Sequence, residues 1–177
     1  MILFDEMGLA EISPYNPLKV IHSELDGNQE VGFVGISNWK LDASKMNRGI
    51  HLSVQEPDLK DLILTAETIA IAIYDEIKHI SQFNNVIENL CKTYFDYKLH
   101  LKEKYSLKYD FHGARDFYYL IKITSRLLKN HKTNSLESIA MESIERNFGG
   151  LELDKEDNTI WSSTKKVKKL FSKYQNN

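Results

Sequence analysis

Two acidic residues directly after a short apolar run are the first side chains in this sequence that could do chemistry. Residues 1–4 are apolar, and Asp5 and Glu6 follow them. In nucleotide hydrolases a strand of this kind carries an aspartate that orders Mg²⁺, and the adjacent glutamate orients or deprotonates a water molecule. The carboxyl end of such a strand opens onto the crevice where α/β sheets bind ligands. The alternative interpretation is a strand with solvated acids at its tip.

A second polar strand end follows the first. Residues 31–36 predict a buried strand, and Asn38 lies just after it. Because parallel strands joined by a helix end at the same edge, we expect the Asn38 amide beside the carboxylates, within reach of a terminal phosphate or the attacking water. Arg48 ends a predicted short helix over 41–46, and its forked, always-charged guanidinium could reach the phosphate of a neighbouring subunit. A turn asparagine and an arginine that stabilises the helix dipole are the competing interpretations.

The elements that must position these side chains form two parts. Strands and short helices alternate over residues 1–55, which predicts an α/β arrangement, and apolar spacing predicts almost only helices over residues 56–177. Continuous apolar runs are typical of strands buried on both faces of a parallel sheet, and we expect that here. The expected strands are residues 1–4, 31–36 and 50–54. The expected long helices are residues 59–77, 83–104, 114–128, 135–148 and 161–174, with an acidic loop over 151–158.

Composition and charge exclude several classes of protein. The chain has 177 residues, of which 42% are apolar, and its formal net charge of −2 argues against binding nucleic acid through counterion release. No apolar run approaches the roughly 18 residues that span a bilayer, and membrane contact is not expected. No basic-then-apolar leader opens the chain, so secretion is not expected either. One cysteine, Cys91, excludes internal disulfides and a zinc cage, and we expect a cytoplasmic protein.

The order of several motifs resembles a known family. Residues 2–11 resemble the Walker B stretch of AAA+ ATPases, and residues 32–49 resemble the sensor-1 strand and the finger region after it. Residues 111–118 and 146–150 resemble stretches of the mysterin family, which are giant dynein-like AAA+ ubiquitin ligases. The resemblance runs from residue 1 to about residue 150 and is discontinuous in the long helices. The order of these separate motifs is more specific than any one of them.

The resemblance implies a role for each matching residue. Asp5 would be the carboxylate on the Mg²⁺ side, holding the ion through water, and Glu6 would be the base that polarises the attacking water. Asn38 would be the sensor-1 residue. Arg48 would be the finger that acts across a ring interface, and Arg115 would be the sensor-2 arginine that folds over bound ATP. Without the family context, Arg115 is simply an exposed residue at a helix start.

The resemblance also implies an architecture and partners. Residues 1–55 would be the later part of an incomplete parallel AAA+ core sheet of about three strands, and residues 56–177 would be a mainly α-helical lid that carries sensor 2 and a basic last helix. The expected partners are ATP and neighbouring AAA+ modules of the same chain or ring. Arg146, just before Gly149, is expected only to stabilise a helix dipole.

One part of the AAA+ pattern is missing from this sequence. No Gly-x-x-x-x-Gly-Lys-Ser/Thr loop, which cradles phosphates, occurs in the chain. In the family that loop follows a strand between the sensor-1 strand and the last strand, so we expect a gap in the middle of the sheet. We therefore expect a chain cut at or just before a central strand, which alone binds ATP poorly and is inactive. A free-standing protein that begins with a strand is the alternative.

Two other functions remain open at this point. A catalytically silent AAA+ module could serve as a structural spacer in a ring, and it is favoured if the upstream segment also lacks the phosphate-binding loop. A helical protein-interaction domain could carry the acidic pair by coincidence, and it predicts no response to Mg·ATP even with the upstream sequence restored.

Overall fold

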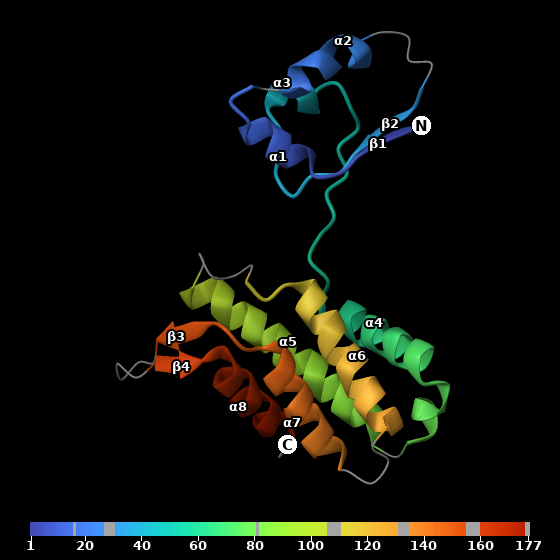
Figure 1. Ribbon diagram of the computed structural model, residues 1–177, viewed down its shortest axis with the longest axis vertical. Coiled ribbons are helices and arrows are strands. Elements are labelled where there is room, and N and C mark those ends of the chain that lie inside the picture. The colour runs from blue at the N-terminus through green and yellow to red at the C-terminus, as the bar shows by residue number, and fades with distance from the viewer. Residues whose placement is uncertain are drawn as a thin grey trace. The chain divides into compact units, whose positions relative to one another are not determined.

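The computed structural model divides the chain into two compact units, Met1–Gln55 and Glu56–Asn177. Figure 1 shows both units, and each is described by itself below. The division falls at the position where the composition of the sequence changes. The residues that the structure describes are 1–15, 17–26, 31–80, 82–105, 111–130, 135–154 and 160–175.

The first unit contains a two-stranded parallel sheet. Strand β1 (Ile2–Phe4) pairs with β2 (Phe33–Gly35), and Ile2 lies opposite Phe33. The ladder continues past both strands, because the Ile36 amide donates to the Phe4 carbonyl at 2.8 Å and the Met7 amide donates to the Ile36 carbonyl at 2.9 Å. Both strands therefore end at the same edge of the sheet.

The other elements of the first unit are short helices. The last of them begins after Asp42, whose side chain accepts a hydrogen bond from the Lys45 amide at 3.1 Å and so caps the first turn. The helices of the first unit are α1 (Met7–Ile12), the 3₁₀ helix η1 (Pro17–Val20), α2 (Ile21–Leu25) and α3 (Ala43–Met46).

Two expectations about the sheet are wrong. Residues 50–54 form no strand, so the parallel sheet has two strands rather than about three. The strands are also not buried on both faces: Leu3 is 57% exposed and Val34 is 43% exposed. The physical reason is that a pair of three-residue strands has too few neighbours to cover its apolar side chains, which in larger parallel sheets are covered by helices on both faces.

The second unit is a bundle of helices, and each long helix that the sequence predicts is present. Helix α5 packs against α4, α7 and α8, and α6 packs against α4 and α7 (Figure 1). Together with the small sheet, this confirms an α/β part followed by a mainly helical part. The helices are α4 (Leu59–Ile73), the 3₁₀ helix η2 (Asp75–His79), α5 (Phe83–Lys104), α6 (Ala114–Asn130), α7 (Leu136–Asn147) and α8 (Ser163–Gln175).

Local capping explains where several of these helices begin. Asp58 and Asp61 form a reciprocal capping box at the start of α4, and the Ser135 hydroxyl accepts from the Ser138 amide at 3.2 Å at the start of α7. The apolar stripes of the helices then face one common core. The large side chains that are completely buried there include Tyr97, Ile121, Phe117, Phe148 and Phe171.

A small antiparallel hairpin was not predicted. Strands β3 (Glu152–Asp154) and β4 (Ile160–Ser162) pair where the sequence indicates an acidic loop, and α8 starts after β4 rather than at Trp161. Residues 155–158 of that expected loop lie outside the described residues. Strands of three residues are too short to show an alternating pattern in the sequence. Within the described part of the chain, no helix combines the length and apolar character needed to cross a membrane.

Candidate functional site

The acidic pair and Asn38 come together in the first unit. Asp5 and Glu6 directly follow β1, and Asn38 follows β2 after two further residues. Because β1 and β2 are parallel neighbours in matched register, these residues lie at the same edge of the sheet. All three are exposed. The arrangement presents two carboxylates and one amide to solvent at the strand ends.

The backbone at Glu6 adopts an unusual conformation. Its φ of 54° and ψ of 35° lie in the left-handed region, and Glu6 is the N-terminal capping position of α1. The Asp5 Oδ1 atom accepts a hydrogen bond from the Glu6 amide at 2.9 Å. Asp5 therefore supports this turn with one carboxylate oxygen, and its other oxygen remains for a ligand.

A tight turn holds Asn38. The Ser37 hydroxyl donates to the Trp39 carbonyl at 2.6 Å and accepts from the Trp39 amide at 3.1 Å. These two hydrogen bonds close the backbone on either side of Asn38. The asparagine is thus placed by its neighbours, and its own amide makes no hydrogen bond that the described residues record.

Glycines allow α1 to lie directly against this turn. A Cβ atom on Gly8 would overlap the Trp39 ring and would lie 2.6 Å from Ser37 Oγ. A Cβ atom on Gly35 would overlap the sulfur of Met7. The close approach fixes the start of α1, and therefore the acidic pair, relative to the end of β2.

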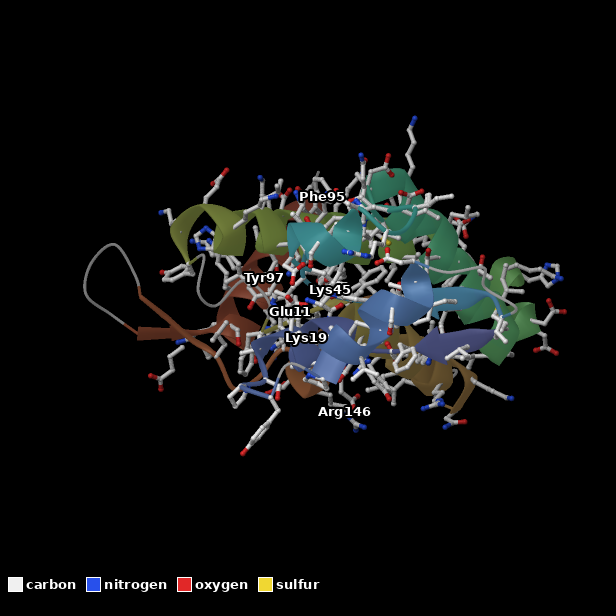
Figure 2. The ribbon with its side chains drawn as sticks, turned by 90° about the horizontal axis from the view of Figure 1, so that it is seen from above. Glu11, Lys19, Lys45, Phe95, Tyr97 and Arg146 are labelled. Carbon is white, nitrogen blue, oxygen red and sulfur yellow. The ribbon has the colours of Figure 1, made fainter. Side chains whose placement is uncertain are left out.

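A buried lysine ties α1 to α3, and sequence reasoning did not find it. The Lys45 side chain is only 4% exposed; its Nζ donates to Glu11 Oε1 at 3.0 Å and also to Asp42. Figure 2 shows Lys45 beside Glu11, which comes from a different helix. The hydrogen bond from Lys45 lowers the pKa of Asp42, and the one to Asp42 raises the pKa of Lys45. The spacing of Asp42 and Lys45 indicates a helix cap, but nothing local points to Glu11.

Arg48 is held by its own chain. Its Nε atom donates to Asp26 Oδ1 at 2.6 Å, and its guanidinium also donates to the Ser44 carbonyl. The hydrogen bond between the two side chains lowers the pKa of Asp26 and raises that of Arg48. The Arg48 side chain is 30% exposed, so it does not project freely as a solvent-facing arginine would.

A cavity of about 360 Å³ adjoins the sheet in the same unit. Its walls include β2 and residues 50–52, the stretch that the sequence predicts as a third strand. His22 also lines it, and the buried Nε2 atom of His22 has no hydrogen-bond partner among the described residues. The cavity is thus lined in part by β2 and in part by a segment that forms no strand.

The two remaining arginines belong to the second unit. Arg115 is the second residue of α6, is exposed, and makes no hydrogen bond or ion pair in the part of the chain that the structure describes. Arg146 lies in the last turn of α7, where its Nη2 atom donates to Glu142 Oε1 at 2.6 Å. An arginine there also offsets the helix dipole, as expected.

The acidic pair fits the coordination habits of Mg²⁺. This ion usually keeps several waters and takes one or two protein carboxylates together with substrate phosphates. Asp5 offers one exposed carboxylate oxygen at a rigid strand end. Over the described ranges, no group of three or more histidine, cysteine, aspartate or glutamate side chains could hold a metal ion by itself.

Comparison with known proteins shows that the sequence belongs to a family of AAA modules. Residues 1–61 match the family described as the RNF213 AAA domain. The chain is 37% identical over 164 residues to E3 ubiquitin-protein ligase rnf213-beta of Danio rerio, and 36% identical over 163 residues to E3 ubiquitin-protein ligase RNF213 of Mus musculus. Each alignment covers 85% of the chain, which spans about 3% of the length of these relatives. No solved structure matches the chain significantly.

Proposed function

We propose that this chain, which is part of an RNF213-type AAA+ module, supplies the hydrolysing edge and the helical lid of an ATP site. The comparisons confirm the resemblance to AAA+ modules of the mysterin type. ATP binding and hydrolysis are our proposal. The observation that carries it is the convergence of Asp5, Glu6 and Asn38 at one edge of a parallel sheet.

In the proposed mechanism each of the three residues has one task. Asp5 would hold Mg²⁺ through a water molecule, and the ion would neutralise charge on the phosphates. Glu6 accepts a hydrogen bond from the attacking water and directs it at the terminal phosphorus. The Asn38 amide donates to a terminal phosphate oxygen as negative charge develops there. The tight turn around Asn38 and the packing of α1 support this assignment, because positioned donors stabilise a transition state better than mobile ones.

Two arginines complete the proposed site. We propose that Arg48 acts on the ATP of a neighbouring module and that Arg115 folds over the nucleotide from the lid. The ion pair with Asp26 restricts the first role. To contact a phosphate, Arg48 must either break its ion pair with Asp26 or use the guanidinium nitrogen that bonds neither Asp26 nor Ser44. Arg115 has no competing partner among the described residues and is exposed.

We further propose that a strand and its phosphate-binding loop, which these 177 residues do not contain, complete the sheet beside β2. The exposed apolar side chains of both strands support this, because parallel strands are normally covered on both faces. The cavity between β2 and residues 50–52 also supports it, since an inserted strand would give these segments a common neighbour.

Replacement of Glu6 by glutamine tests the proposal in a longer chain that also carries the phosphate-binding loop. Glu6→Gln keeps the shape of the side chain but removes its basicity, so ATP binding should persist while turnover falls by about 100-fold or more. Glu103→Gln, the same change at an exposed position of α5, is the matched control and should leave turnover unaltered. Turnover that is equal in both variants would refute the role of Glu6.

The names of the relatives suggest an activity for the longer protein. They are E3 ubiquitin-protein ligases, and we propose that this segment works within a ligase of that kind. The transfer chemistry lies elsewhere in that proposal: Cys91 is completely buried, and burial raises the pKa of its thiol to about 12. A thiol of that kind is a poor acceptor of ubiquitin.

A further inference from the structure

Two stretches that are far apart in the sequence meet at one buried histidine in the second unit. His112 is 3% exposed and lies two residues before Ala114, the first residue of α6. Its Nδ1 atom lies 2.8 Å from the Tyr97 hydroxyl, which projects from α5, and its Nε2 atom lies 3.2 Å from the Gly149 carbonyl, just after α7. The histidine therefore bridges two separate elements.

The chemistry of the groups determines which atom donates and which accepts in each of these two hydrogen bonds. A carbonyl only accepts, so His112 Nε2 carries the hydrogen and donates to Gly149. His112 Nδ1 then accepts from the Tyr97 hydroxyl. Both ring nitrogens are used, and the imidazole is neutral, in agreement with burial that lowers the pKa of His112. The charged groups that act on it are Asp116, which raises this pKa, and Lys98, which lowers it.

Aromatic packing attaches further elements to the same point. The Phe148 ring lies 5.1 Å from His112 and edge-on to Tyr97 at 5.7 Å, measured between ring centroids. The Phe148 carbonyl accepts hydrogen bonds from the hydroxyls of Ser163 and Thr164, both at 2.7 Å. The start of α8 is therefore tied to the segment that His112 contacts.

Arg115 sits in the helical turn that His112 anchors. The Gly113 amide donates to Asp116 Oδ2 at 2.8 Å, and the Asp116 amide donates back to the Gly113 carbonyl at 3.1 Å, so the turn is rigid in itself. Phe117 fixes its inner side by stacking on Tyr94 at 4.8 Å. The outer side carries Arg115, whose direction depends on how the turn is attached at His112.

We propose that His112 is a positioning residue that, through Tyr97 and Gly149, holds the first turn of α6 and with it Arg115, the residue that we assign to ATP. The ATP part of this statement rests on the proposed function. The attachment of the turn is a property of the second unit alone. The same junction joins α5, α6, α7 and α8, so a displacement of any of them reaches Arg115 through His112.

Removal of one hydroxyl tests the attachment in the 177-residue chain. Tyr97→Phe keeps the buried ring but leaves His112 Nδ1 without its donor. Loss of one buried hydrogen bond should raise amide exchange about 5- to 10-fold at residues 113–117 and at residues 149–151 together. Tyr119→Phe, the same change at a half-exposed site on α6, is the matched control. Exchange that is unaltered at either segment, or raised equally throughout α4, would overturn the proposal.

A double-mutant cycle tests the connection to Arg115 in the longer, ATP-hydrolysing chain. Tyr97→Phe should raise KM for ATP several-fold with a smaller effect on kcat, and this effect should vanish when Arg115 is already alanine. An effect that persists in the Arg115→Ala background overturns the proposal. If Arg115→Ala alone leaves KM unchanged, the proposed function of Arg115 fails, and the exchange experiment still decides whether His112 holds the turn.

Discussion

At the scale of single residues, one unusual feature of the candidate site is the left-handed backbone of Glu6. A residue with a Cβ atom in this region costs on the order of 1 kcal/mol, which the surroundings must offset. The hydrogen bonds of the Glu6 amide to Asp5 and of the Met7 amide to Ile36 supply that support on both sides. Strain of this kind is common at catalytic positions, and here it lies at the residue to which we assign the base.

The buried imidazole of His112 predicts a pH dependence. Burial lowers its pKa below the ordinary value of 6.5, so the unfolded chain takes up a proton in a range where the folded chain does not. The free energy of unfolding of the second unit should therefore be highest above about pH 7 and should fall as the pH is lowered through 6.5 and below. Urea denaturation at about pH 7.5 and about pH 5.5 measures the difference.

Two variants separate His112 from other acid-sensitive groups. His112→Phe should be less stable than the parent at neutral pH, because Tyr97 and Gly149 lose their partner, but its stability should change less between the two pH values. His79→Gln, at an exposed position in η2, should retain the full dependence. A dependence of the same size in the His112 variant would show that other groups cause it.

At the scale of elements, the contact of α1 with the end of β2 is the packing on which the candidate site depends. Gly8→Ala puts a methyl group into the Trp39 ring, and overpacking of this kind costs about 1–3 kcal/mol. Helix propensity alone predicts that Gly8→Ala stabilises the protein, since alanine is the better helix former. We expect faster amide exchange at Met7 and Ile36, whose amides bridge the two strand ends.

Gly32→Ala is the matched control for that substitution. Apart from Gly32 itself and its two chain neighbours, nothing lies within 4 Å of the position that its Cβ atom would take, so exchange at the strand ends should remain as in the parent. Slower exchange in Gly8→Ala would mean that α1 is not held against Trp39, and the placement of Asn38 beside the acidic pair would lose its support.

At the scale of the whole molecule, the chain carries candidate residues for hydrolysis but no loop for the phosphates. The loop would contribute backbone amides and a lysine, whereas the edge of β1 contributes two acidic side chains that repel a triphosphate. We therefore expect that the isolated chain gives no heat of ATP binding at micromolar concentrations in calorimetry, and that a longer chain with the loop does. Micromolar ATP binding by the isolated chain would contradict the expectation that the phosphate-binding loop, which this chain lacks, is needed for ATP binding.

The order and type of the elements were predictable because they depend on local features. Apolar spacing and capping residues such as Asp58 and Ser135 act within a few residues, and the long helices appear where these signals place them. Ends were less predictable: the first long helix stops at Ile73, because Tyr74 is extended and a 3₁₀ turn follows. The placement of Asp5, Glu6 and Asn38 at one edge was also predictable, since it needs only two parallel strands.

What the sequence determined by itself is therefore a short α/β part with polar strand ends, followed by a helical part. Only the tertiary structure decided that residues 50–54 do not join the sheet, that Lys45 is buried against Glu11, and that His112 joins two distant stretches. Each of these depends on which distant segments meet and how completely they cover one another. These contacts depend on the packing of the whole unit, and the spacing of residues that are close in sequence does not predict them.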